Sequence, residues 1–173
     1  MTIRPISLLL LLALAGCGAE QSSPPAAPAA ERAAAKPASS KEMPALTVET
    51  FQGGTFNLAE HRGKWVVVNF WATWCAPCLK EIPDFNAFAK SRPDVQFIGL
   101  AYEEIERADM EAFLKDHPID YPFAILDVYN PPADFDTPRG LPMTVLVAPD
   151  GKVAKTFLGP VTSADLAAAI DGA

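Results

Sequence analysis

The 173-residue sequence has few basic residues and contains no run of them. It holds 14 Lys and Arg against 21 Asp and Glu, so its formal net charge is −7 at pH 7. A nucleic-acid-binding domain needs a basic patch to neutralise phosphates, and the sequence shows none. We therefore expect no nucleic acid among its partners.

Metal-ligating residues are also scarce, with three cysteines and two histidines in the chain. A structural zinc site needs four ligands. Cys17 ends an N-terminal segment, which leaves Cys75 and Cys78 with only His61, His117 and carboxylates to complete such a site. We predict no metal and no bound cofactor, while half a zinc site stays open as an alternative for the cysteine pair.

Residues 1–16 have the pattern of a secretory signal peptide. Arg4 and the α-amine supply positive charge, an apolar run extends over Leu8–Leu14, and two small residues precede Cys17. The apolar run is too short to cross a bilayer as a permanent helix. We therefore predict export of the chain.

Leu14-Ala15-Gly16-Cys17 resembles the lipobox of bacterial lipoproteins. The resemblance implies cleavage before Cys17 and lipidation of its sulfur and new amino group, and several acyl chains together anchor a protein stably. Gly18 is not the aspartate that favours inner-membrane retention, so an outer-membrane anchor facing the periplasm is expected. An ordinary signal peptide with an incidental cysteine is the alternative.

A polar, alanine-rich stretch follows the lipidation site and completes the predicted tether over residues 17–43. Residues 18–43 contain nine Ala, four Pro and four Ser and no aromatic residue. Such a composition cannot bury enough apolar surface to offset its ordering entropy. We predict a disordered tether with a mean reach of about 30 Å, followed by one domain over residues 44–173.

Apolar and β-branched runs predict the strands of that domain. Lys64–Trp71 and Val95–Ala101 are nearly continuous apolar runs, which are typical of buried strands. Gly53-Gly54 and Asp150-Gly151 are turn signals that predict two hairpins. The strands of these hairpins are Leu46–Val48 with Thr55–Leu58, and Thr144–Val147 with Lys152–Leu158.

Three helices are predicted, at Pro77–Lys90, Glu106–His117 and Ser163–Ile170. The first has apolar residues at spacings of three and four, although its interior Pro83 should kink it. Thr162 or the residue after it should cap the last. The order of hairpin, βαβα, hairpin and helix predicts an α/β fold, with a mixed sheet and helices on both faces.

Cys75-Ala76-Pro77-Cys78 follows the central strand and opens the first helix. Cysteines at i and i+3 lie on one side of the first turn, so their sulfurs can reach disulfide distance. The partial positive charge at a helix N-terminus lowers the pKa of a cysteine there. We expect Cys75 to be the exposed nucleophile and Cys78 the buried resolving thiol. A purely structural disulfide is the alternative.

The block VVNFWATWCAPC, which ends at Cys78, resembles the TlpA/ResA branch of thioredoxin-like proteins, and Glu81 and Pro83 extend the resemblance. It covers Leu46–Ile170 and implies a thioredoxin-like three-layer fold with an extra N-terminal hairpin. It also implies a thiol–disulfide oxidoreductase that is exported and tethered to a membrane, often as a reductase in cytochrome c biogenesis. The expected partners are a disulfide-containing protein substrate and a membrane reductase of the DsbD/CcdA type as electron donor.

The resemblance also gives a role to Gly140-Leu141-Pro142, which precedes a predicted strand. In thioredoxin-like proteins a cis-proline at this place faces the dithiol, and the backbone of the residue before it pairs with the substrate chain. We therefore expect a cis bond at Pro142 and substrate binding at Leu141 and Pro142.

Three residues near the dithiol are further candidates. Glu81 lies three residues after Cys78, so it shares a helix face with that thiol and can accept its proton; a solvated glutamate is the alternative. Asn69 stands where thioredoxin has a buried aspartate, and an amide cannot exchange protons. Trp74 is expected beside the active-site loop, either in the core or as a substrate contact.

The alternative function is a copper- or haem-handling chaperone that uses the Cys75/Cys78 dithiol as ligand. Met143 is a candidate thioether ligand for Cu(I), but copper chaperones of the Sco type carry Cys-x-x-x-Cys, one residue longer than here. A thiol peroxidase would carry Pro-x-x-x-Thr-x-x-Cys, and Val68 and Ala72 break that pattern.

Family members tend to have a short helix at residues 130–139, where three prolines predict an irregular loop instead.

Overall fold

A computed structural model gives the structure of residues 41–173. The signal peptide, Cys17 and the tether up to residue 40 lie outside the described residues. None of the helices in the described part combines the length and the apolar character that a membrane crossing demands.

Within residues 41–173, Lys41 and Glu42 already contact the domain. The ammonium group of Lys41 forms an ion pair with Asp136, and the carbonyl of Glu42 accepts a hydrogen bond from the amide of Val153 at 2.8 Å. Contacts with the domain are therefore present before Pro44, where the change in composition placed the start of the fold.

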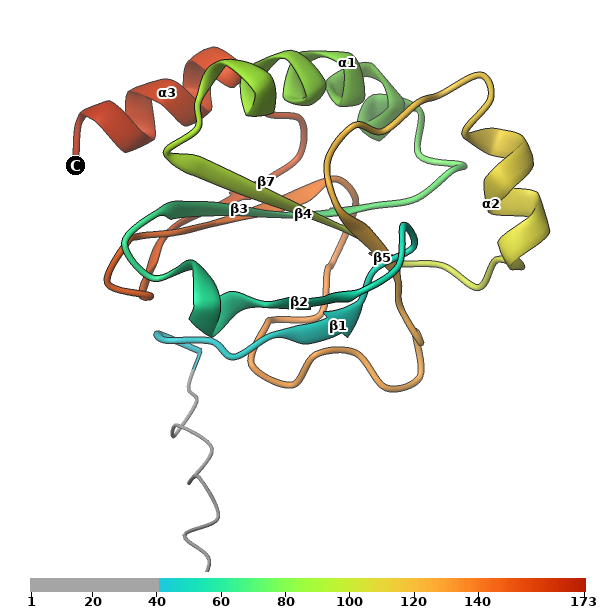
Figure 1. The fold of residues 1–173 in the computed structure, drawn as a ribbon, viewed down its shortest axis with the longest axis horizontal. Coiled ribbons are helices and arrows are strands. Elements are labelled where there is room, and N and C mark those ends of the chain that lie inside the picture. The colour runs from blue at the N-terminus through green and yellow to red at the C-terminus, as the bar shows by residue number, and fades with distance from the viewer. Residues whose placement is uncertain (1–40) are drawn as a thin grey trace, which may run out of the picture. The chain divides into compact units, whose positions relative to one another are not determined.

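A five-stranded mixed sheet in the order β5-β4-β3-β6-β7 forms the centre of the domain (Figure 1). β3, β4 and β5 are parallel, whereas β6 is antiparallel to both β3 and β7. Six of the seven residues of β3 are buried, as its apolar sequence predicts. The strands are β3 (Trp65–Trp71), β4 (Val95–Ala101), β5 (Phe123–Ile125), β6 (Met143–Val147) and β7 (Val153–Leu158).

The long helices pack on one face of this sheet, where α1 (Ala76–Ser91) and α3 (Ser163–Asp171) lie side by side (Figure 1). Alternate residues of β3 and β4 point to this face and contact apolar side chains of α1 and α3. Met110 of α2 (Arg107–Phe113) packs against side chains of the same face. Thr162 caps α3 in a reciprocal capping box with Asp165.

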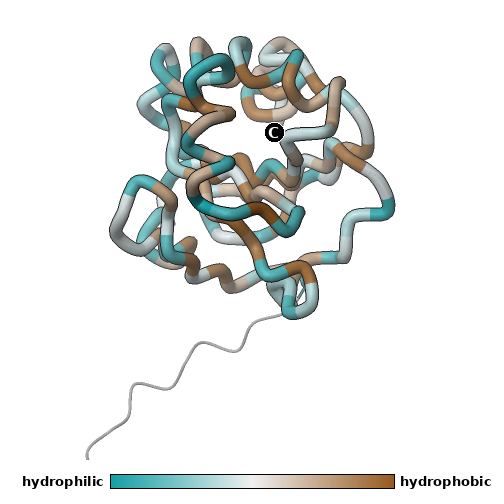
Figure 2. Tube along the Cα trace, turned by 90° about the vertical axis from the view of Figure 1, so that its right-hand side faces the viewer, coloured by the Kyte–Doolittle hydropathy of each residue, from teal (hydrophilic) through white to brown (hydrophobic). Residues whose placement is uncertain are grey.

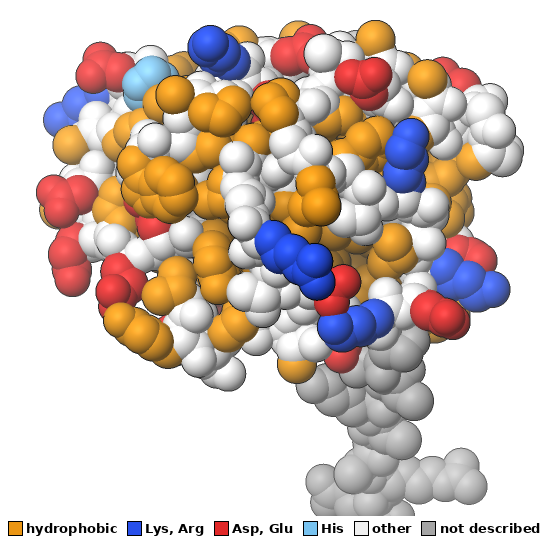
Figure 3. Space-filling model, turned by 180° about the vertical axis from the view of Figure 1, so that it is seen from behind, with side chains coloured by type: hydrophobic (Ala, Val, Ile, Leu, Met, Phe, Trp, Pro, Cys, Tyr) orange, Lys and Arg blue, Asp and Glu red, His pale blue; other side chains and the backbone are white. Residues whose placement is uncertain are grey.

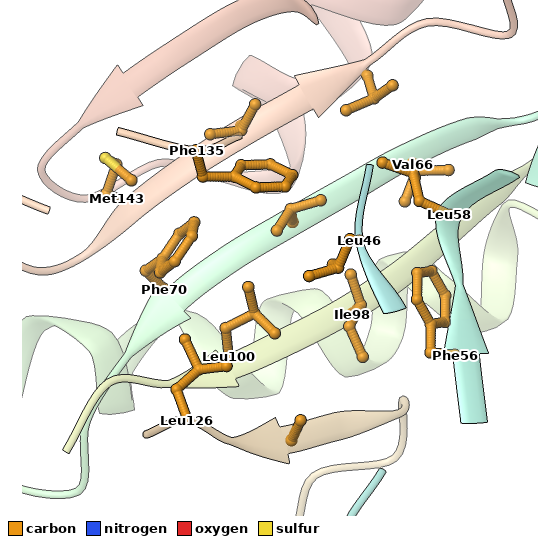
Figure 4. Close-up of a cluster of buried hydrophobic side chains, with 14 residues drawn as sticks. Leu46, Phe56, Leu58, Val66, Phe70, Ile98, Leu100, Leu126, Phe135 and Met143 are labelled. Carbon is orange, nitrogen blue, oxygen red and sulfur yellow. The ribbon is translucent and has the colours of Figure 1, made fainter. Parts of the chain in front are cut away.

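The opposite face is covered by the hairpin of β1 (Thr47–Glu49) and β2 (Thr55–Asn57), the 3₁₀ helix η1 (Leu58–His61) and the loop 130–139. The loop 130–139 contains no regular helix, as its three prolines predict. Figure 4 shows the apolar cluster between the two layers. Its members include Leu46, Phe56, Leu58, Val66, Phe70, Ile98, Leu100, Leu126, Phe135 and Met143.

The tip of the β1–β2 hairpin closes the β5 edge of the sheet. The amide of Phe51 donates to the carbonyl of Phe123 at 2.7 Å. The Gln52 side chain donates to the carbonyl of Tyr121 at 3.2 Å and accepts from the Phe123 amide at 3.3 Å. Gly53 and Gly54 have φ of 93° and 84°, a conformation that glycine adopts without strain. The tip therefore satisfies backbone groups that an open edge would leave unpaired.

Three elements differ from the sequence-based expectation, and the first is the 3₁₀ helix η1, which was not predicted. β5 was not predicted, because a strand of three residues gives almost no periodic signal. α2 ends at Phe113 rather than at His117, since the chain continues beyond it in turns. The other strands and helices lie within two residues of their predicted positions.

Hydrophobic stretches gather toward the middle of the molecule and many hydrophilic ones lie at its periphery (Figure 2). In the view from behind, basic side chains lie singly or in small groups among acidic ones (Figure 3). This face therefore carries no continuous basic surface.

Candidate active site

The dithiol lies where β3 passes into α1. Cys75 is the N-cap residue of α1, its sulfur accepts a hydrogen bond from the Cys78 amide at 3.3 Å, and Pro77 occupies the first turn. The two cysteines form a disulfide with a Cα–Cα distance of 5.3 Å. The local sequence favours this arrangement, because proline fits the first helical turn, where a missing N–H leaves no bond unmade.

Both sulfurs are buried in this disulfide form. Cys75 is 4% exposed and Cys78 is 1% exposed. The expectation that Cys75 is an exposed residue is therefore wrong for the oxidised protein, because the residue packs into the apolar cluster formed by Trp71, Ile82 and Ala101. Cys75 is the more exposed of the two cysteines, as expected, but the difference between them is small.

The strand directions bring several loops to the same end of the sheet as the dithiol. β3, β4 and β5 are parallel, so the segments that follow all three strands meet there. β6 is antiparallel to β3, so it begins at that end, directly after Pro142. The segment following β7 reaches the same end for the same reason.

Pro142 follows a cis peptide bond with Leu141, as expected. Its carbonyl accepts a hydrogen bond from the Gly159 amide at 2.9 Å, which ties the start of β6 to the end of β7. The Leu141 side chain is partly buried against the cluster that contains Cys75 and Cys78. The structure therefore brings the predicted Leu141-Pro142 segment to the dithiol.

Glu81 lies inside the protein on α1 and is not a solvated residue. One carboxylate oxygen, Oε1, accepts a hydrogen bond from the Val161 amide at 2.5 Å. The other oxygen, Oε2, has no hydrogen-bond partner among the described residues. Burial raises the pKa of Glu81 to about 7; the Val161 hydrogen bond opposes the rise and the nearby charge of Asp84 adds to it.

Tyr121 and Trp71 place two more polar atoms in this interior. Among the described residues, the Tyr121 hydroxyl and the Trp71 indole nitrogen have no hydrogen-bond partner. Burial raises the pKa of Tyr121, and the charge of Glu81 raises it further. Gly99 makes room for both rings: a Cβ there would lie 3.1 Å from the indole nitrogen and 3.2 Å from Cε2 of Tyr121.

Asn69 and Trp74 occupy opposite environments. Asn69 is buried, and its side-chain amide donates to the Thr144 hydroxyl at 3.0 Å, which links β3 to β6. Trp74 is 69% exposed directly before Cys75. The alternative of a core role for Trp74 is therefore wrong, and the exposed ring is accessible to another molecule.

Met143 points away from the dithiol. Alternation along β6 places its side chain on the hairpin face, near Phe70 and Phe135 (Figure 4). His61 stacks on Phe56 and His117 stacks on Phe113. Within residues 41–173, no three His, Cys, Asp or Glu side chains are gathered as a metal would require.

Glu103 and Tyr121 were not identified as site residues from the sequence. Glu103 is buried after β4 and accepts two hydrogen bonds from Thr73, in the loop before Cys75. The signal that could have found Glu103 is the strand order. Because β3 and β4 are parallel neighbours, the residues that follow them lie at the same end of the sheet. Tyr121 gave no signal, because a tyrosine before a proline is unremarkable in a loop.

Comparisons with known proteins bear on this arrangement. The profile of the AhpC/TSA family matches residues 40–159, which include the dithiol, Glu81 and Pro142. The chain belongs to the AhpC/TSA family. It is similar to a thiol-disulfide oxidoreductase ResA of Bacillus cereus, with 34% identity over 128 residues that cover 73% of each chain.

Other members and structures agree with this placement. The chain is 30% identical to ResA of Bacillus subtilis strain 168 over 125 residues, which cover 70% of this chain and 68% of that one. A crystal structure of a thiol:disulfide interchange protein from Chlorobium tepidum TLS is 28% identical, with a TM-score of 0.64 over 79% of this chain and 97% of that chain.

For this member of the AhpC/TSA family, three expectations are confirmed. The resemblance to the ResA branch is one, and the thioredoxin-like α/β fold is the second. The third is the class of enzyme, a thiol–disulfide oxidoreductase. Export, lipidation at Cys17, tethering and a part in cytochrome c biogenesis stay predictions.

Proposed function

We propose that this thiol–disulfide oxidoreductase is a membrane-tethered periplasmic reductase of disulfides in exported client proteins. The observation that carries the proposal is the Cys75–Cys78 disulfide at the N-terminus of α1, beside the cis-peptide at Pro142. A helix N-terminus stabilises a thiolate, and the neighbouring segment supplies a place for a client chain.

The reaction is a dithiol–disulfide exchange without a bound cofactor. The Cys75 thiolate attacks a client disulfide, forms a mixed disulfide and releases one client sulfur as a thiolate. Cys78 then attacks the Cys75 sulfur and releases the second client sulfur. The client gains two electrons and the protein is left as the Cys75–Cys78 disulfide.

Glu81 handles the proton of the second step. Cys78 must lose its proton before it attacks, and Glu81 lies three residues further along the same helix. A carboxylate with a pKa of about 7 accepts a proton at neutral pH and returns it readily. Asn69 cannot serve as this base, because an amide does not exchange protons, and its side chain instead donates to Thr144.

The client chain docks beside Pro142. Leu141 lies against the dithiol cluster, and its backbone would pair with an extended client segment. The exposed ring of Trp74, directly before Cys75 in the chain, would add an apolar contact. Leu141, Pro142 and Trp74 are therefore the proposed substrate-binding residues.

The direction of exchange follows from the residues between the cysteines. Ala76 and Pro77 lack the histidine of strongly oxidising relatives, so we expect a potential of about −200 to −270 mV. Electrons would come from a membrane reductase of the DsbD/CcdA type, and apocytochrome c is one candidate client. A potential near about −120 mV would refute a reductase.

The proposed location is a lipid anchor at Cys17 facing the periplasm, with the outer membrane favoured by Gly18. A tether of about 30 Å from the outer membrane falls short of an inner-membrane donor. The proposal therefore requires inner-membrane sorting, a soluble carrier or a client at the outer membrane. Recovery only with inner-membrane fractions would select the first of these.

The test is a trap with Cys78→Ser, which cannot complete the second step. The full chain carrying this change is expected to hold discrete client and donor proteins as mixed disulfides with Cys75, released by a reductant. The matched control is Cys75→Ser, which keeps Cys78 but should capture far less. An empty trap, together with a wild-type protein that retains copper stoichiometrically, would overturn the proposal and support the copper-handling alternative.

A further inference from the structure

The loop before Cys75 is held by a single buried carboxylate. The Thr73 amide donates to Oε1 of Glu103 at 2.6 Å, and the Thr73 hydroxyl donates to Oε2 at 2.8 Å. Glu103 is 8% exposed. Both oxygens accept hydrogen bonds, which is the pattern of an ionised carboxylate rather than of the neutral acid.

This carboxylate has no cationic partner within the described part of the chain. Across residues 41–173, Glu103 takes part in none of the salt bridges, which involve other acidic residues. A buried charge is costly unless hydrogen bonds or an opposite charge compensate it. Here the two hydrogen bonds from Thr73 compensate the charge, so the carboxylate of Glu103 is held against the loop that leads to the dithiol.

The position of Cys75 depends on that loop. The loop is the short connection from the end of β3 to the N-cap of α1, and the Cys75 amide donates to the carbonyl of Ala72 at 3.1 Å. Glu103 fixes Thr73, which lies between these two residues. The contact therefore joins the segments that follow β3 and β4 and limits how far the sulfur of Cys75 can move.

We infer that Glu103 is a positioning residue for Cys75: it fixes the loop that carries the nucleophile and places a negative charge near it. The inference rests on the proposed exchange function and adds a residue to it. A fixed negative charge near a thiol disfavours the thiolate and opposes the positive helix N-terminus. Glu103 thus keeps the reduced form less stable and the protein more reducing.

Other charged groups lie on the elements around Cys75, and they set the controls. On α1 these are Lys80 and Glu81, and on the segment after β4 they are Glu104 and Glu106. Arg139 is on the loop before Pro142. Glu106 is exposed and its side chain makes no capping bond, so it differs from Glu103 in burial while sharing its charge and its segment.

The test is the pH dependence of Cys75 alkylation in the reduced full-length protein, measured by mass spectrometry. In Glu103→Gln, the side-chain oxygen still accepts from the Thr73 amide, and the side-chain NH₂ group can donate to the Thr73 hydroxyl. The loop therefore stays held, and only the charge is lost. In this variant, the pH midpoint of Cys75 alkylation is expected to fall by about half a pH unit. The reduction potential of the Cys75–Cys78 pair should become less reducing. Glu106→Gln should move the midpoint much less, because water and salt screen an exposed charge.

A second pair of variants tests the hold on the loop. Thr73→Val removes one hydrogen bond and keeps the charge, so it should slow exchange several-fold with an unchanged midpoint. Glu103→Asp keeps the charge with a shorter reach and should behave similarly. An unmoved midpoint in Glu103→Gln, or an equal shift in Glu106→Gln, would overturn the inference. Absence of exchange in the wild-type protein would instead refute the proposed function, since the alkylation profile needs no client.

Discussion

Both faces of the sheet bury apolar clusters, but they differ in the polar atoms buried beside them. The hairpin face holds an apolar cluster (Figure 4). The helix side holds the dithiol and three polar atoms without a hydrogen-bond partner among the described residues, on Trp71, Glu81 and Tyr121. Unpaired buried polar atoms cost free energy. The comparison indicates a division in which both faces supply apolar burial, and the helix face gives up part of its stability in unpaired polar atoms near the dithiol.

The largest expected effect is the loss of exchange in Cys75→Ser. Without the nucleophile, reduction of a disulfide peptide should fall to the uncatalysed rate. The change also removes the disulfide, and closing so short a loop is worth about 2 kcal/mol in the chain-entropy view. Residual turnover above the uncatalysed rate would mean that Cys78 can start the reaction, and would break the assignment of roles.

The next effect separates the two faces. Leu58→Ala on the hairpin face should lower the free energy of unfolding by about 2–5 kcal/mol, because it leaves a cavity in a packed cluster. Leu158→Ala is the matched control, since Leu158 is 67% exposed. Urea denaturation measures both. Below the transition Leu58→Ala should keep the wild-type exchange rate, and a large loss of rate would contradict the division.

The third effect is the pH dependence of stability due to Glu81. Folding raises its pKa from an ordinary value of 4.5 to about 7. The folded state then holds a proton that the unfolded state has already lost, so the contribution to stability is complete below pH 4.5 and is lost as the pH rises through 7. The full shift corresponds to an upper bound of about 3 kcal/mol, which solvent screening of the carboxylate reduces.

Glu81→Gln should remove that pH dependence. Urea denaturation of the oxidised protein between pH 4.5 and 8 should show the wild type losing stability relative to this variant, which is the more stable one above pH 7. Glu60→Gln, which changes an exposed carboxylate on η1, serves as the control. Parallel curves for wild type and Glu81→Gln would show that the carboxylate is well solvated.

The smallest effect concerns Tyr121. Tyr121→Phe removes a buried hydroxyl without a partner among the described residues, so the protein should become more stable by about 1 kcal/mol. Tyr129→Phe, at an exposed ring, should change stability by less than about 0.5 kcal/mol. A loss of stability in Tyr121→Phe would show that the hydroxyl is paired, and would narrow the difference between the faces.

The parts of the fold that sequence could predict are those specified locally. The buried strand Val95–Ala101 was predicted with its observed bounds, because a run of apolar residues flanked by polar ones is a local pattern. The place of Cys75 at the start of a helix followed from Pro77 and from the strand before it. The cis bond at Pro142 came from the family resemblance, since an X–Pro bond is rarely cis on its own.

The parts that sequence missed depend on contacts between distant segments. β5 is a strand only because it pairs with β4 and with the hairpin tip. Glu103 becomes a site residue only when the segment after β4 meets the loop before Cys75. The burial of Cys75 likewise results from tertiary packing, which the rule about helix N-termini does not include.

The closure of β5 by Phe51 and Gln52 has a consequence for how a client can enter. An uncovered edge strand pairs with extended chains of any sequence and so seeds aggregation. The proposed reductase would meet chains that are not yet folded, and an open edge would bind them away from the dithiol. With the hairpin tip bonded to Phe123, strand addition is blocked at β5. Under the proposed function, a client chain that pairs at Leu141 would therefore not be held a second time at this edge.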